Sequence, residues 1–291
     1  MHGASHRWPR RVSLPAFRFR LCALLRSGTR SLNELRSGAA SLTSPKARFD
    51  AVRGSRYRVP VPDPHTLPPE WERALPSSFN FDGLYRTADS LYSPGAPPVY
   101  PSRDVVFRAF LETSPSEVRV VVVGLDPYPD PAQLGAGKGI ADGLAFSSRG
   151  FPPQRSLKVM LGYLGKGSSS YPASGDLTPW AQRGVLLLNS SLTFDTAASN
   201  ARCPDHLALW RELITQTLTA VSARKDSATG QLLPTAFLLL GSEAHKFKRA
   251  ILNANSHNLQ LLRHPSRGGW PASAVPAINA FAGLDATFWS L

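Results

Sequence analysis

The clearest hydrophobic pattern in the chain is a set of four short apolar runs, each followed at once by polar or small residues. The runs occupy residues 118–123, 184–189, 235–241 and 259–263, and the first of them is interrupted only by Arg119. Runs of this length are too short for an ordinary helix and are typical of strands that are buried on both faces. Each run therefore predicts one strand of a buried sheet.

The segments between these runs show helical spacing or helix-start signals. After Asp205, for example, Trp210, Leu213 and Ile214 recur at intervals of three and four residues. We predict helices at 69–75, 103–111, 156–164, 178–180, 205–221, 242–252 and 274–281, with Ser102, Ser156, Thr178, Asp205 and Ser242 as N-caps. We expect the rest of 60–100 to be irregular. Strands that alternate with helices predict an α/β protein, a three-layer α/β/α fold with a central four-stranded parallel sheet.

The positive charge of the chain is concentrated at its N-terminus. The formal net charge is +13, and residues 1–60 account for about +11 of it, with twelve arginines and one lysine against two acids. We predict a basic N-terminal extension over 1–60 and a folded domain over 61–291. The extension has three open interpretations: an arm that touches nucleic acid, a mitochondrial or plastid transit peptide, or an extension from a misplaced start codon.

Composition narrows the class of protein further. An apolar fraction of 42% and a charged fraction of 18% are those of a globular domain. The chain has no run of 18 apolar residues, so we expect no membrane contact. Its two cysteines, Cys22 and Cys203, form neither a disulfide framework nor a zinc-ligand pattern, and we expect no metal and no cofactor. A reducing compartment follows: a bacterial-type cytoplasm, or a mitochondrion or nucleus if the extension is a targeting segment.

Polar side chains with distinct chemistry stand where the four predicted strands end. Asp126 follows the first, Asn189 ends the second, Ser242 follows the third and His264 follows the fourth. Because parallel strands end at the same edge of a sheet, where such folds bind ligands, we expect these residues to meet. Each also has a structural explanation, as a turn residue, a helix cap or a hydrogen-bonding partner.

Together these side chains suit one kind of reaction. A carboxamide such as Asn189 offers a donor and an acceptor to the edge of a pyrimidine. His264 can stabilise an oxygen that gains charge as a group leaves, and Asp126 can orient water or stabilise a cationic sugar. Phe146 could stack on a base, although a phenylalanine in this context is more often a core residue.

Five ordered segments then resemble the uracil-DNA glycosylase family in its widespread family-1 form. Residues 124–129 (GLDPYP) are similar to the water-activating loop, and residues 143–147 (GLAFS) to the base-stacking segment. Residues 175–189 closely match the segment that ends in the uracil-reading asparagine. Gly241-Ser242 resembles a phosphate-contacting turn, and residues 264–266 (HPS) resemble the start of the DNA-intercalation loop.

The resemblance implies a monomeric enzyme that flips uracil out of single- or double-stranded DNA and hydrolyses its N-glycosidic bond to leave an abasic site. It implies no cofactor and no obligate protein partner. Asp126 would position water, His264 would bind the uracil oxygen, Asn189 would read the base, Phe146 would stack on it and Tyr128 would exclude thymine. The DNA-binding residues would be Ser156, Ser242 and Ser266.

Three departures from the family pattern stand out. Leu125, in the substrate-binding loop, replaces the usual glutamine, and residues 134–142 form an insertion. The wedge leucine of the intercalation loop falls on Gly268, so we expect Arg267 or Trp270 to fill the vacated base stack. These departures keep two alternatives open: a DNA-binding protein with weak or no catalysis, and a glycosylase for another damaged base.

Overall fold

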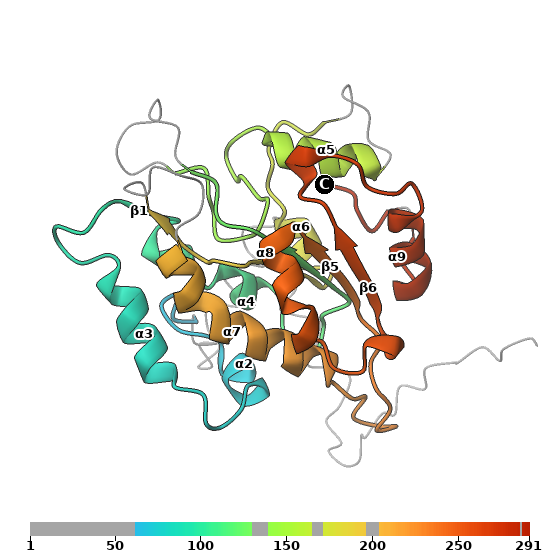
Figure 1. Ribbon diagram of the computed structural model, residues 1–291, viewed down its shortest axis with the longest axis horizontal. Helices are drawn as coiled ribbons and strands as arrows, with labels where there is room; N and C mark the ends of the chain where they lie inside the picture. Colours follow the sequence, from blue (N-terminus) through green and yellow to red (C-terminus); the bar gives the residue numbers. More distant parts are fainter. Residues whose placement is uncertain (1–61, 130–138, 165–170, 196–203, 286) are drawn as a thin grey trace, which may run out of the picture. The chain divides into compact units, whose positions relative to one another are not determined.

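The computed structural model describes residues 62–129, 139–164, 171–195, 204–285 and 287–291 (Figure 1). The predicted basic extension and most of the predicted insertion lie outside these residues. The domain boundary near residue 60 and the compartment therefore stay predictions.

Four parallel strands form the centre of the fold. They are β2 (Val120–Gly124), β3 (Val185–Asn189), β5 (Ala236–Leu240) and β6 (Asn258–Leu262). Their order across the sheet is β3-β2-β5-β6, and every neighbouring pair is parallel. All residues of β2, β3 and β5 are buried, which agrees with their continuous apolar runs. The predicted four-stranded parallel sheet is confirmed.

Helices cover both faces of this sheet. The α-helices are α2 (Pro69–Ala74), α3 (Phe81–Ser90), α4 (Arg108–Glu112), α5 (Arg155–Tyr163), α6 (Thr178–Ala181), α7 (Pro204–Ser222), α8 (Ser242–His245) and α9 (Ala274–Ala282). Short 3₁₀ segments are η1 (Arg103–Val105), η3 (Lys246–Ala250), η4 (Ala254–Ser256) and η5 (Pro265–Arg267). Strands β1 (Val99–Tyr100) and β4 (Phe194–Asp195) form a separate antiparallel pair.

Two contacts identify the layers. Met160 of α5, Trp180 of α6 and Ile278 of α9 line one small apolar gap together with Val122 and Leu238 of the sheet. The ring centroid of Phe107, beside α4, lies 5.9 Å from that of Trp210 on α7. In Figure 1, α5 and α9 lie on one side of the sheet, and α7, α2 and α3 lie on the other. The predicted three-layer α/β/α architecture is confirmed.

The details of several helices differ from the sequence-based expectations. Residues 81–90, expected to be irregular, form α3, whose N-cap Asn80 accepts a hydrogen bond from the backbone N–H of Gly83 at 2.9 Å. The single helix predicted over 103–111 is divided into η1 and α4.

Four of the five predicted N-caps are wrong. Ser102 is the N-cap residue of η1, although its side chain makes no cap bond, whereas Ser156, Thr178, Asp205 and Ser242 already lie inside their helices. At α8 the cap is Gly241, which has a positive φ of 97°. A turn of the backbone therefore starts this helix, and no hydroxyl is needed to do so.

Among the described residues, no helix has both the length and the apolar character that crossing a bilayer requires.

We predict that Trp71→Ala destabilises the fold by about 3–5 kcal/mol. Trp71 is fully buried, and its indole N–H donates to the carbonyl oxygens of Phe110 and Thr113 at 3.1 and 2.9 Å. Truncation leaves a cavity and two carbonyl groups without their donor. Urea unfolding followed by circular dichroism measures the change, with Leu252→Ala, at a side chain that is 44% exposed, as the control. A loss below about 1 kcal/mol for Trp71→Ala would contradict this packing.

Candidate active site

The register between β2 and β3 brings the first two predicted site segments together. Gly124, the last residue of β2, is paired with Asn189, the last residue of β3. Beyond this pair, the backbone N–H groups of Ser190 and Ser191 donate to the carbonyl oxygens of Gly124 and Leu125, both at 3.0 Å. The loop that carries Asp126 is therefore held beside the asparagine side chain.

A small pocket lies at this edge of the sheet and contains the five residues expected to act on the base. It encloses about 110 Å³. Its lining includes Asp126, Tyr128, Phe146, Asn189 and His264, together with Ser156 at the start of α5. Drug-sized ligands occupy pockets of roughly 300–1,000 Å³, so this one has room for a single small ring.

Gly124 lies against two residues of the pocket lining, Asn189 and Phe146, where a side chain has no room. A Cβ added there would lie 2.5 Å from Oδ1 of Asn189 and 3.0 Å from the ring of Phe146. Glycine therefore lets the carboxamide and the aromatic ring approach each other across the end of β2.

The stacking candidate Phe146 is held in a strained conformation. Its φ is +65°, which is uncommon for a bulky residue, and its side chain is buried. The phenol of Tyr128 donates to its carbonyl oxygen at 3.2 Å. The backbone N–H of the preceding Ala145 donates to the carbonyl of Leu187 in β3 at 3.1 Å. The segment is thus tied both to the sheet and to the loop of Asp126.

Two buried charged residues that we did not predict as site residues organise the same segment. One carboxylate oxygen of Asp142, Oδ2, accepts from the Ser147 hydroxyl at 2.7 Å and the Arg149 backbone N–H at 2.8 Å. Its Oδ1 accepts from the Leu144 backbone N–H at 3.2 Å. The guanidinium of Arg108 lies 3.1 Å from Oδ2, and both side chains are buried.

The sequence carries a weak signal for each member of this pair. Asp142 stands directly before a glycine, and Arg108 stands inside the otherwise apolar segment 105–111. Asp142 lies behind the pocket wall, because its neighbours Ala141 and Gly143 line the pocket and Asp142 does not.

Contacts of His264 fix its tautomer. The backbone N–H of Ser266 donates to Nδ1 at 3.3 Å, and the Ser266 hydroxyl lies 2.8 Å from the same nitrogen. Because a backbone N–H can only donate, Nδ1 is the acceptor and the proton of the neutral ring is on Nε2. Burial, and then the positive charge of Arg267, lower the pKa of His264. A neutral imidazole with an Nε2–H donor is therefore available to a ligand.

Tyr128 forms a fixed and uncharged wall of the pocket. Burial raises the pKa of its phenol far above the usual value. Its hydroxyl donates to the Phe146 carbonyl and is hydrogen-bonded to the backbone N–H of Leu157 in the first turn of α5. The ring is thus clamped between two neighbouring segments.

Trp270 is not where we expected a DNA wedge. Its side chain is 7% exposed and stacks on Tyr163 of α5, with ring centroids 4.9 Å apart and an interplanar angle of 11°. Its indole N–H donates to the carbonyl of Arg263 at 2.8 Å, and its backbone N–H donates to the Tyr163 hydroxyl at 3.0 Å. A ring held in this way does not project from the surface, which argues against the wedge role expected of Trp270.

The remaining predicted site residues lie around the pocket rather than in its lining. Ser242, Ser266 and Arg267 are exposed. Leu125 is partly buried and contributes its carbonyl oxygen to the contact with Ser191. Ser266, which was predicted as a phosphate ligand, also orients the ring of His264.

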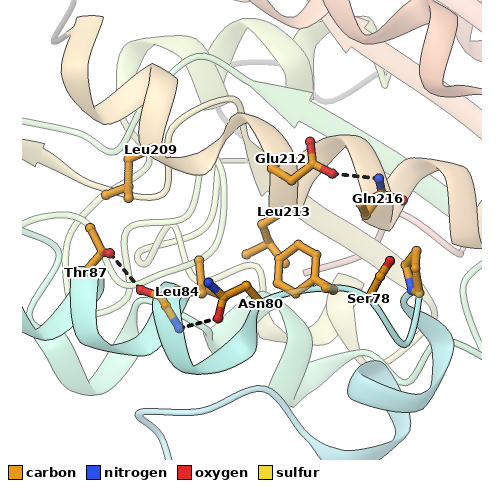
Figure 2. Close-up of a pocket in the computed structure, with 11 residues that line it drawn as sticks. Ser78, Asn80, Leu84, Thr87, Leu209, Glu212, Leu213 and Gln216 are labelled. Carbon is orange, nitrogen blue, oxygen red and sulfur yellow. Dashed lines mark hydrogen bonds between the residues drawn. The ribbon is translucent and has the colours of Figure 1, made fainter.

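A larger groove lies elsewhere, between α3 and α7 (Figure 2). It encloses about 390 Å³. The carboxamide of Gln216 donates to Glu212 at 2.7 Å, and Asn80 accepts from the backbone N–H of Gly83. None of the residues predicted to act on the base lines this groove. Within the described ranges, no group of three or more His, Cys, Asp or Glu residues could hold a metal ion.

The fold and the site together define an α/β protein with a small pocket of polar and aromatic side chains at the carboxyl edge of a parallel sheet. No protein-family model matches the chain. Uracil-DNA glycosylase from Streptococcus thermophilus is 36% identical to it over 223 residues, which cover 72% of this chain and 92% of that protein. Uracil-DNA glycosylase from Streptococcus sanguinis is 34% identical over 224 residues, with coverages of 74% and 93%. The chain belongs to the uracil-DNA glycosylase family.

A solved structure agrees at the level of the fold. The crystal structure of mimivirus uracil-DNA glycosylase superposes with a TM-score of 0.56 and 22% sequence identity, and the match covers 69% of this chain and 70% of that chain. The α/β architecture is therefore shared with this solved structure.

We predict that Arg267→Gln raises the pKa of His264. The arginine charge disfavours the imidazolium, so its removal makes protonation easier, most clearly at low ionic strength. NMR titration of the histidine ring protons measures the pKa, with His264→Leu to assign the signal. Arg249→Gln, which removes an exposed charge on η3, is the matched control and should leave the pKa unchanged. An unaltered pKa in Arg267→Gln would contradict the placement of Arg267 beside the imidazole.

Proposed function

We propose that this protein removes uracil from DNA by hydrolysing the bond between base and sugar. One observation carries the proposal: in a member of this family, a pocket of about 110 Å³ gathers Asp126, Tyr128, Phe146, Asn189 and His264. The pocket is sized for one base and holds both the groups that recognise a pyrimidine and those that promote hydrolysis.

Recognition of the base combines a flat surface with a polar edge. The ring of Phe146 offers a stacking face, and the carboxamide of Asn189 offers a donor and an acceptor to the uracil edge. The clamped ring of Tyr128 occupies the space that a methyl group on the base would need. Thymine is therefore excluded by a steric clash, whereas uracil fits.

Hydrolysis requires that uracil leave with the electron pair of the C1′–N1 bond. The negative charge that develops on the uracil oxygen accepts a hydrogen bond from Nε2–H of His264. Because that nitrogen carries the proton in a neutral ring, the donor is already in place before the bond breaks.

The other half of the reaction takes place at the sugar. The carboxylate of Asp126 stabilises the positive charge that develops there and holds the attacking water. The water oxygen bonds to C1′ and its proton passes by way of Asp126 to solvent, while the uracil anion takes up one proton. Atoms and charges then balance, with an abasic site and free uracil as products.

DNA containing uracil is the proposed partner, and its backbone would be held around the pocket mouth. Ser156 lies in the first turn of α5, Ser242 opens α8, and Ser266 and Arg267 lie in η5. Hydroxyl and guanidinium groups of this kind contact phosphates without reading sequence. We propose that the enzyme acts as a monomer and without a cofactor.

We predict that Asp126→Asn and His264→Leu each slow uracil release by about 10²–10⁴-fold. Each change removes a group that acts on the reacting atoms and leaves the stacking face and Asn189 in place. Single-turnover cleavage of a labelled uracil oligonucleotide gives the rate, and fluorescence anisotropy gives DNA affinity, which should change little.

The matched controls for this prediction are Asp82→Asn, at an exposed position, and His65→Leu, at a partly exposed one, both outside the pocket. They should keep the rate of the unaltered protein. Tight DNA binding by the unaltered protein with no abasic product would instead favour a DNA-binding protein without catalysis. Abasic product from other deaminated bases and none from uracil would favour a glycosylase of different specificity.

We predict that Tyr128→Ala gains activity on thymine and loses about tenfold on uracil. Removing the ring opens space for the methyl group, and it also removes the hydrogen bond that holds Phe146. The measurement is release of thymine from an otherwise identical oligonucleotide. Tyr171→Ala removes a tyrosine outside the pocket, whose hydroxyl donates to the backbone carbonyl of Lys158, and should change neither rate. If Tyr128→Ala releases no thymine, the ring is not the methyl filter.

A further inference from the structure

We infer that this enzyme acts on uracil in single-stranded DNA and removes it poorly from duplex DNA, because the loop beside its pocket has a bare tip. The inference rests on the function proposed above and names its substrate class. It concerns the loop of residues 264–270, which begins at the pocket residue His264.

The tip of this loop carries no side chain. Gly268 and Gly269 follow η5, with φ values of +62° and +77°. A Cβ added to Gly268 would meet no atom within 4 Å, so the space at this position is open. The left-handed backbone of both residues favours glycine, so the conformation of the tip itself disfavours any side chain there.

Trp270, the large apolar residue of the loop, does not cover the tip. Trp270 is stacked on Tyr163 and makes two hydrogen bonds, one to the hydroxyl of Tyr163 and one to the carbonyl of Arg263. Moving its ring outward would break the stacking on Tyr163 and the hydrogen bond to the Arg263 carbonyl. Trp270 thus anchors the loop to α5, and the tip is left to the two glycines.

No exposed large apolar side chain of the described residues supplies a substitute at the pocket. The large hydrophobic side chains that are exposed in the described part of the chain are Leu252, Leu261 and Leu291, and none of them lines the pocket. A protein that extracts a base from a duplex must break its pair and its stacking, and proteins that unstack DNA commonly insert an apolar side chain into the gap. A uracil in a single strand has no partner base, so no side chain has to take its place in a base stack.

The charges of the loop suit a single strand. Arg263 and Arg267, which flank the tip region, are both exposed. Proteins that bind single strands combine a positive surface along the backbone with an aromatic ring for stacking, and Phe146 offers such a ring inside the pocket. Phosphate contacts of this kind form equally well without a complementary strand.

The test uses one labelled oligonucleotide with a single uracil, presented as a single strand, opposite guanine and opposite adenine. We expect single-turnover rates in the order single strand, U·G mismatch, U·A pair, with a difference of roughly 30-fold or more between the first and the last. Equal rates on the single strand and the U·A duplex would overturn the inference and leave the proposed function standing. Absence of product from all three substrates would overturn the proposed function itself.

A pair of variants tests the cause. Gly268→Leu adds an apolar side chain at the open tip, and Gly268→Ala shares its backbone penalty without the reach. We expect Gly268→Leu to reduce the ratio of single-strand to duplex rates at least about threefold relative to Gly268→Ala. Because each variant is its own reference on the single strand, partial loss of folding cancels from the ratio. The same ratio in both variants would show that the bare tip is not the cause and would overturn the inference.

Discussion

The pairing of Gly124 with Asn189 at the ends of two buried parallel strands is the constraint on which the site depends. Both strands are buried along their whole length, and their register runs from the pair of Val120 and Val185 to the pair of Gly124 and Asn189. In that register, the carboxamide of Asn189 lies beside the loop of Asp126. The missing side chain of Gly124 then lets Phe146 close over the same point.

The buried pair of Arg108 and Asp142 also supports the site. It positions the segment around Phe146 more than it stabilises the fold. Burying two charges costs about as much as their attraction returns, so such pairs are weak contributors to folding. Asp142 nevertheless gathers backbone N–H groups on both sides of Phe146, from Leu144 and Arg149. A strained φ can persist there because its surroundings leave the segment no other arrangement.

The sheet and the meeting of Asp126, Asn189 and His264 could be predicted from the sequence because both follow from local signals, namely apolar runs and what stands at their ends. The places of Tyr128 and Phe146 were implied by the family resemblance. What could not be predicted depends on partners far along the chain. Whether Trp270 points inward is decided by Tyr163, 107 residues earlier, and the role of Asp142 is decided by Arg108, 34 residues earlier. Helix α3 was missed because 60–100 is rich in proline and aromatic residues, a composition that resembles an irregular layer.

One consequence of helix α5 concerns stiffness. Its first turn holds the hydroxyl of Tyr128 through the N–H of Leu157, and its last residue, Tyr163, holds Trp270 and with it the loop of His264. One helix therefore contacts two components of the pocket. Walls that are tied to the same helix resist separate movement, which favours a pocket preorganised at one width. The proposed discrimination by a single methyl group requires such resistance to spreading.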